Sequence, residues 1–279
     1  MLRGAPRSIL LITLLLCSAT KLWAASVPGG VYTWPVPRGA SDVRYHDKPV
    51  FTYQNHAFVG ISIKAQPGTE ELTYLHNGAT HTHAFPITGK QYTEQRLQIK
   101  NRAMVNPPED TLARIRSEAV RQRKLYNSHT EAHNLDQGFI LPLQGIVTSL
   151  FGHRRILNGQ ARNPHSGLDI AADTGTPIMA PAGGVVVLAD DLYFNGKTLF
   201  IDHGRGLVTM YCHLSEILSE VGQVVAQGEE IGLVGATGRV TGPHLHWSVS
   251  LNGNRVDPQV FMALLNDVAI PEPAAAALP

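Results

Sequence analysis

His244-Leu245-His246-Trp247-Ser248-Val249-Ser250-Leu251 is the most informative stretch of this chain. Apolar and polar residues alternate along it, which is the period of a β-strand with one buried face. Residues i and i+2 of a strand point to the same side, so His244 and His246 are expected to face one cavity. The stretch therefore predicts a strand that carries two neighbouring imidazoles.

A second stretch, His165-Ser166-Gly167-Leu168-Asp169, places an imidazole and a carboxylate four residues apart. Gly167 disfavours a helix, so we expect a loop that enters a strand over Leu168 to Ala171. A catalytic zinc site needs three ligands from His, Asp, Glu or Cys and a fourth position for water. The two stretches together supply such a set, whereas any one of these histidines alone would be read as an ordinary polar residue.

The composition indicates a globular protein without a nucleic-acid signature. The chain has 279 residues, of which 43% are hydrophobic and 16% charged, and its formal net charge is +1. This length suggests two domains or one large β domain. The charge is near zero and no basic run occurs, which argues against nucleic acid as a partner. Thirteen histidines modestly favour metal chemistry.

Residues 1–25 have the pattern of a signal peptide. Two arginines precede an apolar run from Ile9 to Cys17, and the small residues Ala24 and Ala25 follow. The alternative is an uncleaved membrane anchor, for which the run is shorter than the ~20 residues that a span needs. Cleavage would leave Cys212 as the one cysteine, without an internal disulfide. We expect a periplasmic protein of a Gram-negative envelope, with no stable membrane insertion after cleavage.

The fold expected is mainly β, in three parts. Residues 26–105 contain short alternating runs that predict a small amino-terminal β domain, arranged as a sandwich. Residues 106–138 are predicted to form a connecting helix, from Thr111 to about Asn127, and a polar linker. Acidic residues begin this helix and basic residues end it, which suits the helix dipole.

Residues 139–268 are predicted to form a carboxy-terminal domain with an antiparallel β-sheet. This part is dense in glycine and β-branched residues, and His203-Gly204-Arg205-Gly206 has the pattern of a hairpin turn. Residues 269–279, rich in proline and alanine, are expected to be a mobile tail.

Several motifs in the carboxy-terminal part occur in the order of a known family. They are Ser149-Leu150-Phe151-Gly152-His153-Arg154, His165-Ser166-Gly167-Leu168-Asp169-Ile170, Gly175-Thr176-Pro177-Ile178 with Ala180-Pro181, Tyr211-Cys212-His213-Leu214, Gly235-Ala236-Thr237-Gly238 and Gly242-Pro243-His244-Leu245-His246. In this combination, over residues 139 to 262, the chain resembles the LytM/lysostaphin-type zinc metallopeptidases of family M23, which cut peptide cross-links in peptidoglycan. The amino-terminal part resembles, more loosely, the non-catalytic module of exported members.

The resemblance implies a lysostaphin-like fold, a Zn²⁺ cofactor and stem peptides of peptidoglycan as substrate, with D,D-endopeptidase activity expected. His165, Asp169 and His246 match the family's zinc ligands. His213 and His244 match its two non-ligand active-site histidines. We expect His244 to act as general base and His213 to donate to the oxyanion, although the two roles can be exchanged.

Other residues near the motifs have less specific interpretations. Cys212 alternates with His213 and is expected to point away from the cleft. The loop from Arg154 to Arg162, with three arginines, is expected either to bind carboxylates of the stem peptide or to be a solvated charged loop. Within it, Asn158 is a candidate to reach the metal in a self-inhibited state. His153, His203 and the pair His81 and His83 are expected to be structural or surface residues.

Two other functions compete with a hydrolase. One is a non-catalytic LytM-like regulator that binds and activates another wall hydrolase, with an envelope protein as partner. The other is a carrier domain, because Val221 to Gly228 resembles a turn of biotinyl or lipoyl domains. A carrier needs a lysine at a hairpin tip, and Lys197 lies outside that setting. Among the bonds that a hydrolase could cut, a Gram-negative setting favours the D-alanyl cross-link over glycine bridges.

Overall fold

The computed structural model describes residues 26–131 and 138–269. The predicted signal peptide and the predicted mobile tail lie outside the described residues, apart from position 269, and both stay predictions. Within the described ranges, no helix combines the length and apolar character that crossing a membrane requires. The prediction of a mainly β fold with antiparallel sheets is confirmed.

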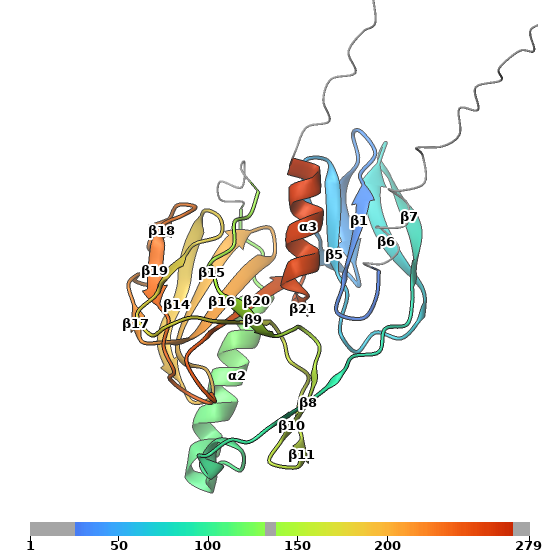
Figure 1. The fold of residues 1–279 in the computed structure, drawn as a ribbon. Helices are drawn as coiled ribbons and strands as arrows, with labels where there is room; N and C mark the ends of the chain where they lie inside the picture. Colours follow the sequence, from blue (N-terminus) through green and yellow to red (C-terminus); the bar gives the residue numbers. More distant parts are fainter. Residues whose placement is uncertain (1–25, 132–137, 270–279) are drawn as a thin grey trace, which may run out of the picture.

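The largest sheet in the described chain has eight strands and forms the body of the carboxy-terminal half (Figure 1). Its order is β18-β14-β15-β16-β20-β12-β9, with β21 paired to β20, and its neighbours are antiparallel. The strands are β9 (Ile146–Ser149), β12 (Leu168–Ala171), β14 (Gly184–Leu192), β15 (Gly196–Gly204), β16 (Leu207–Leu214), β18 (Val224–Val225), β20 (Leu245–Leu251) and β21 (Asn254–Val256). A smaller sheet consists of β13 (Pro177–Met179), β19 (Glu230–Leu233) and β17 (Glu216–Ile217).

The alternation along β20 gives this sheet two different faces. Trp247 and the apolar residues two positions to either side of it are fully buried in the main core. His246 and Ser248 alternate with them and so project from the opposite face. The core face is covered by α3 (Pro258–Ala269), a helix that the sequence analysis did not anticipate, and Phe261 of α3 packs within the main core.

The amino-terminal strands form two facing sheets, as the sandwich prediction required. One has the order β1-β5-β4 and the other β3-β2-β6-β7. Their strands are β1 (Val31–Pro35), β2 (Ser41–Tyr45), β3 (Lys48–Pro49), β4 (Phe51–Tyr53), β5 (His56–Gly60), β6 (Gly68–His76) and β7 (Ala79–Ile87). Trp34, Val59, Leu72 and Phe85 belong to the core between them. The other face of the first sheet meets α3, where Phe58 lies 6.4 Å from Phe261 between ring centroids, so both faces of that sheet are covered.

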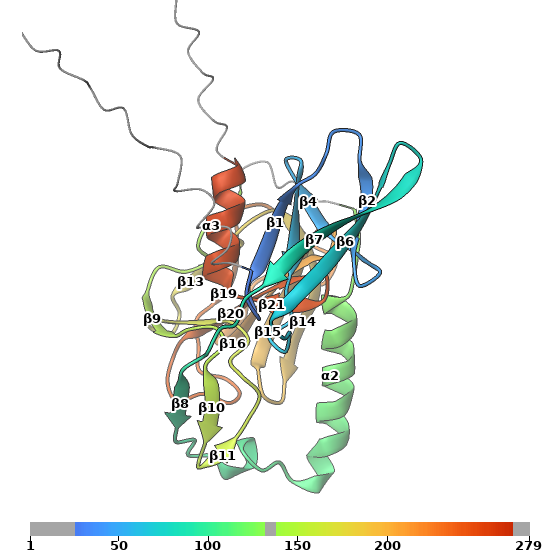
Figure 2. The same ribbon diagram turned by 90° about the vertical axis from the view of Figure 1, so that its right-hand side faces the viewer.

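The connecting segment between the two halves runs along one face of the large sheet, the face that carries His246 and Ser248. β8 (Glu94–Leu97) pairs in parallel with β10 (Arg154–Leu157), and two short 3₁₀ helices, Arg102–Met104 and Glu109–Thr111, then lead to α2 (Leu112–Tyr126). Figure 2 shows α2 on one side, β10 and β11 (Gln160–Ala161) on the other, and the connection passing between their lower ends. The helix predicted over Thr111 to Asn127 is therefore confirmed. The predicted domain boundaries stay predictions, and β8 adds a strand of the first part to the second.

The expectation of a loop from Arg154 to Arg162 is wrong, because this segment is the hairpin of β10 and β11. Asn158 and Gly159 form its turn with φ of 48° and 80°, a left-handed conformation that Asn and Gly tolerate best. The Asn158 side chain accepts a hydrogen bond from Ile99 N at 2.7 Å and donates one to Ile99 O at 3.0 Å. Both ends of this amide are used to hold the hairpin against the preceding segment, so the idea that Asn158 reaches the metal is wrong for this structure.

Candidate active site

Three side chains that the sequence placed in a metal cage meet on the outer face of the large sheet. Asp169 on β12 and His246 on β20 are cross-strand partners, and His165 lies just before β12. His165 Nε2 lies 2.9 Å from Asp169 Oδ1 and 3.0 Å from His246 Nδ1. His246 Nδ1 lies 2.7 Å from Asp169 Oδ1. The three side chains are buried, and together they have the spacing of a set that could hold one metal ion.

Hydrogen bonds behind the cage determine which nitrogen of each imidazole faces inward. His165 Nδ1 donates to Leu150 O at 2.7 Å, which leaves Nε2 as the inward atom of the neutral ring. Ser248 Oγ donates to Ser166 O at 2.9 Å and can then accept from His246 Nε2 at 3.0 Å, which leaves Nδ1 inward. Such partners orient metal-binding histidines in known sites.

Charge in the cage is concentrated on Asp169. Burial alone would raise the pKa of this carboxyl, but the adjoining imidazoles of His165 and His246 hold it well below its usual value, so it is ionised at pH 7. Burial, opposed by Asp169, lowers the pKa of His246 to about 4, so this imidazole is neutral at pH 7. The second carboxylate oxygen, Oδ2, accepts from Arg155 Nη2 at 2.9 Å.

These residues fit a zinc ion by the chemistry of their donor atoms. Two imidazole lone pairs and one carboxylate oxygen converge within 3.0 Å of one another, an arrangement that repels unless a cation lies between them. Imidazole nitrogen and carboxylate oxygen are the ligands of catalytic zinc sites, at about 2.0–2.2 Å, and three such ligands leave the fourth position open. The assignment of His165, Asp169 and His246 as ligands stays a prediction, now with a geometry that suits it.

His213 and His244 lie beside this cage and have equivalent hydrogen bonds. His213 Nδ1 donates to Thr237 O at 2.8 Å, and His244 Nδ1 donates to Gly242 O at 2.9 Å. Each neutral ring therefore presents a bare Nε2. His244 Nε2 lies 3.9 Å from Asp169 Oδ1, and the His213 ring centroid lies 6.1 Å from that of His246. The structure brings all five predicted site residues together.

The position of Cys212 corrects one expectation. Cys212 pairs across the strands with His246, and paired residues share a face, so Cys212 lies on the cleft side of the sheet and not away from it. His213 has a φ of 67°, and this left-handed residue at the end of β16 breaks the strand alternation. Regular alternation would have put the thiol on the face opposite to His213, and the left-handed turn at His213 removes that relation. Cys212 is covered by Tyr126 of α2 and its neighbours in a small apolar cluster.

The four histidines expected to be structural or surface residues lie outside the cage. His203 is fully buried and its ring bonds Gly183 O and Thr209 Oγ1, a structural role in the core. His153 Nδ1 lies 3.3 Å from Ser149 Oγ, behind the cage at its rim. His81 and His83 are on β7 in the amino-terminal part, where His83 stacks on Trp34.

A cavity of about 660 Å³ adjoins the cage and is covered from above by the connecting segment. His213 and His246 line it together with Val105 and Pro107 of the connection and with Glu118 and Gln122 of α2. Polar contacts hold this cover in place: Glu118 Oε2 accepts from Tyr193 N at 2.9 Å, and Asn195 Nδ2 donates to Gln122 Oε1 at 3.2 Å. Tyr126 is the one buried residue of α2, so little apolar surface fixes the helix.

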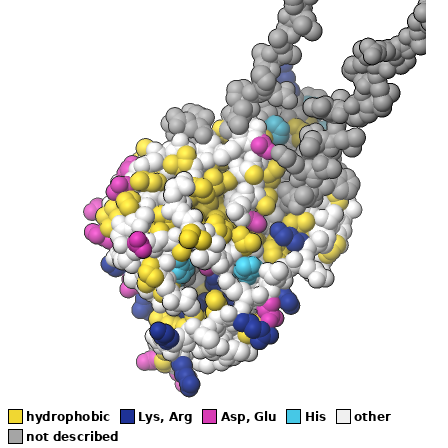
Figure 3. Space-filling view, viewed as in Figure 1, with side chains coloured by type: hydrophobic (Ala, Val, Ile, Leu, Met, Phe, Trp, Pro, Cys, Tyr) yellow, Lys and Arg dark blue, Asp and Glu magenta, His cyan; other side chains and the backbone are white. Residues whose placement is uncertain are grey.

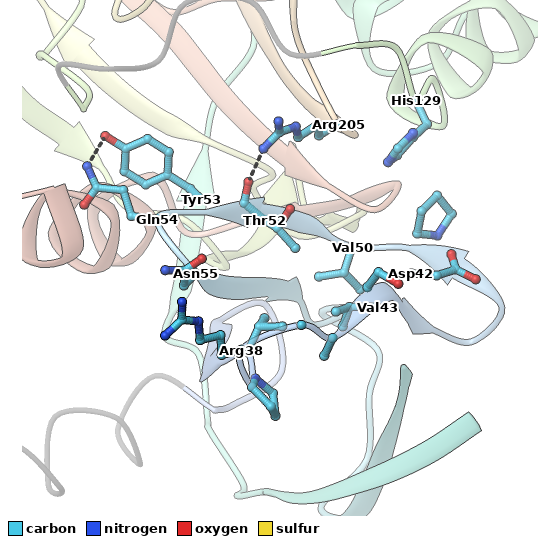
Figure 4. Close-up of a pocket in the computed structure, with 16 residues that line it drawn as sticks. Arg38, Asp42, Val43, Val50, Thr52, Tyr53, Gln54, Asn55, His129 and Arg205 are labelled. Atoms are coloured by element: carbon cyan, nitrogen blue, oxygen red, sulfur yellow. Dashed lines mark hydrogen bonds between the residues drawn. The ribbon is translucent and has the colours of Figure 1, made fainter. Parts of the chain in front are cut away.

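A larger cavity, of about 1010 Å³, lies elsewhere and contains none of the five site residues. Loops of the amino-terminal sheets line it, with Arg205 and His129 at its border (Figure 4). Arg205 Nη1 donates to Thr52 O at 3.0 Å, and Gln54 bonds the hydroxyl of Tyr53 at 3.2 Å, so the polar groups at this end satisfy one another. Size favours this cavity, but the convergence of titratable groups identifies the smaller one as the candidate active site.

The fold and this site together define a β-sheet protein with two histidines and one aspartate that could hold a metal ion. The model of peptidase family M23 matches residues 163–258, which include all five site residues. A crystal structure from Pseudomonas aeruginosa described as a peptidase M23 is 36% identical, with a TM-score of 0.70, and the match covers 87% of this chain and 96% of that one. The chain therefore belongs to peptidase family M23.

Two curated relatives come from Vibrio cholerae serotype O1. Peptidoglycan DD-endopeptidase ShyC is 43% identical over 222 residues, which cover 79% of this chain and 43% of that protein. Peptidoglycan DD-endopeptidase ShyA is 43% identical over 112 residues, which cover 40% of this chain and 26% of that protein. The chain thus spans less than half the length of either relative.

Proposed function

We propose that this chain is a zinc-dependent peptidoglycan hydrolase that cleaves stem-peptide cross-links as a D,D-endopeptidase. The observation that carries the proposal is the convergence of three donor atoms beside two imidazoles with bare Nε2 atoms. Membership of family M23 and the names of the Vibrio relatives support the reaction and the substrate.

In this mechanism His165, Asp169 and His246 hold the zinc ion. A zinc ion held by these three residues would supply a water of pKa ~7 and a Lewis acid for the scissile carbonyl. One imidazole Nε2 accepts a proton from the attacking water and returns it to the leaving amine, and the other would stabilise the oxyanion as an imidazolium after taking a proton from solvent. The carbonyls of Thr237 and Gly242 hold His213 and His244 in the tautomer that these steps need.

The test uses the purified full chain with zinc and cross-linked muropeptides, with products identified by mass spectrometry. Zinc-loaded protein is expected to convert dimers to monomers, and His165→Ala and His246→Ala are expected to abolish this conversion and to lower the bound zinc. His81→Ala removes an exposed histidine far from the site and serves as control. Cleavage that persists in both cage variants would rule out the assigned site.

A second candidate function is a non-catalytic regulator that binds and activates another wall hydrolase. The observation that favours it is the cover of Val105, Pro107 and α2 over the cavity. It predicts that the zinc-loaded chain cleaves nothing, even when α2 is loosened by Glu118→Gln, yet stimulates a purified wall hydrolase. Direct cleavage by the loosened variant would exclude a purely regulatory role.

We also propose that the chain is exported to the periplasm of a Gram-negative cell. The charged, apolar and small-residue regions of residues 1–25 support this, and those residues lie outside the described ranges. Cell fractionation with amino-terminal sequencing is the test. A cytoplasmic chain that retains Met1 would overturn the proposal.

A further inference from the structure

The cavity beside the catalytic histidines is strongly cationic. Four guanidinium groups line it, from Arg155, Arg162, Arg239 and Arg255, and the one carboxylate on its wall is Glu118. That carboxylate is already engaged by Arg114 and by the backbone of Tyr193. Lys and Arg side chains are also visible at the lower end of the molecule, where α2 and the β10–β11 hairpin lie (Figure 3). The cavity therefore favours an anionic ligand.

Two of these arginines have structural partners. Arg155 pairs with Asp169 behind the metal cage, at 2.9 Å. Arg255 lies 5.4 Å from the ring centroid of Tyr126, in a cation–π contact with α2. Arg155 and Arg255 therefore already have partners within the protein, Asp169 and Tyr126.

Arg162 and Arg239 bind oxygen atoms of the connecting segment instead. Arg162 Nη2 donates to Val105 O at 2.8 Å and to Asn106 Oδ1 at 3.3 Å, in addition to Gln160 Oε1 of its own hairpin at 2.6 Å. Arg239 Nη1 donates to Met104 O at 3.4 Å, and its guanidinium lies over the Phe194 ring at 4.5 Å. In the described part of the chain, no carboxylate lies within ion-pair distance of either group.

Two guanidinium groups without a carboxylate partner are expected to lower the stability of the fold unless an anion binds them. Burial, together with the charges of Arg155 and Arg162, lowers the pKa of Arg239 to about 10. A partly buried cation without a counter-ion loses hydration that no carboxylate replaces, whereas a guanidinium binds a carboxylate through two parallel hydrogen bonds. In this structure the N–H donors of the two guanidinium groups bind neutral carbonyl oxygens, although a negatively charged carboxylate oxygen would suit them better.

We propose that Arg162 and Arg239 bind a free carboxylate of the substrate peptide, and that Met104 O and Val105 O occupy their donors in its absence. The proposal rests on the proposed function, because it takes the substrate to be a stem peptide. Stem peptides carry free carboxylates on the diaminopimelate side chain and on glutamate. These two sources have the same chemistry, and the experiment separates them.

The experiment uses a cross-linked peptide dimer in three forms: with all carboxylates free, with the diaminopimelate carboxylate amidated, and with the glutamate carboxylate amidated. Wild-type protein is expected to cleave one amidated form with a KM about ten- to a hundredfold higher than the free acid, the range for a charged hydrogen bond. Arg239→Gln and Arg162→Gln are expected to bring the acid and that amide to within about twofold of each other. If a variant only loosened the connecting segment, its KM would change by the same factor for all three substrates. A change in the ratio of KM between the free acid and the amide therefore reports the contact with the carboxylate.

Arg154→Gln is the matched control, because Arg154 lies on the same hairpin but is exposed and does not line the cavity. It is expected to keep the wild-type preference. If either glutamine variant fails to fold, as judged by circular dichroism, the other carries the test. Equal cleavage of all three substrates by wild-type protein would overturn the carboxylate site while leaving the hydrolase intact.

A binding measurement keeps the carboxylate site testable if the hydrolase proposal fails. Calorimetry with uncross-linked stem tetrapeptide and its amides requires no turnover. Tighter binding of the acid to wild-type protein, lost in Arg239→Gln, supports the site even for a chain that cleaves nothing. Equal affinity of wild-type protein for acid and amides would overturn it.

Discussion

His213 and His244 lie 4.9 Å apart between ring centroids, and each directs its Nδ1 hydrogen to a backbone carbonyl. The pair comes from neighbouring strands, His213 from the end of β16 and His244 from just before β20. Burial and the neighbouring His244 and His246 hold the pKa of His213 well below its usual value, so it is neutral at pH 7. With Nδ1 donating to a carbonyl, the neutral form of each ring has its free lone pair on Nε2.

Replacing the imidazole of His213 or His244 should lower the catalytic rate without removing the bound zinc. His213→Ala and His244→Ala are each expected to lower kcat by about 10²–10⁴-fold, the usual contribution of a positioned acid or base. Zinc content, measured by mass spectrometry of the metal, should stay near one ion per chain. Loss of zinc in either variant would show that the residue is a ligand and that the assignment must change.

Ser248 should tune the affinity for zinc through His246. Its hydroxyl links His246 Nε2 to Ser166 O, so Ser248→Ala removes the group that selects the inward nitrogen. Zinc affinity is expected to fall about 10–100-fold, as for other outer partners of metal ligands. Ser250→Ala is the matched control on the same face of β20, because Ser250 Oγ is buried without a hydrogen bond. Equal affinities of the two variants for a competing chelator would contradict the prediction.

Gly167 should not tolerate a side chain. A Cβ at this position would come within 2.3 Å of Trp247 O and 2.9 Å of His246 Cε1, and strand β20 cannot move away without breaking its ladder. Gly167→Ala is expected to lower the free energy of unfolding by about 1–3 kcal/mol, as overpacking does. Gly89→Ala, where the nearest atom lies at 3.6 Å, is the control. Urea denaturation of both variants makes the comparison, and equal midpoints would argue against this packing.

Weakening the attachment of α2 should raise the hydrolase activity, because this helix covers the cavity beside the candidate site. Glu118→Gln weakens the ion pair with Arg114 and the bond to Tyr193 N, so the helix should leave the sheet more often. We expect a severalfold rise in kcat/KM on muropeptides and faster proteolysis near α2. Arg116→Ala changes an exposed residue of the same helix and should have neither effect. An unchanged rate with faster proteolysis would mean that the helix does not limit access.

Cys212 should be inert in the folded chain. Burial raises the pKa of its thiol far above the usual value, so little thiolate forms at pH 8. Peptide-resolved labelling with iodoacetamide is expected to be at least about a hundredfold slower than in urea, because the thiolate is the reactive form. Rapid labelling of the native protein would show that α2 opens often enough to expose the cleft.

The sequence by itself determined the strands and the members of the site. Local alternation predicted β20, Gly167 predicted the entry to β12, and the ordered motifs identified the family whose fold the chain has. These signals are short-range, since they depend on the period of the backbone and on residue types a few positions apart. The alternating runs and the density of glycine and β-branched residues also indicated correctly that the fold is mainly β.

Only the tertiary structure decided how the site is completed and covered. The positive φ of His213, the pairing of Arg155 with Asp169 and the cover of the cavity by the segment from Met104 to α2 depend on contacts between residues 14 to more than 80 positions apart. No periodicity encodes such contacts, because they follow from how separate elements pack. The sequence predicted the five residues of the candidate site. The fold determined which nitrogen each histidine directs into the site, and it placed the connecting segment and α2 over the cavity that a substrate would enter.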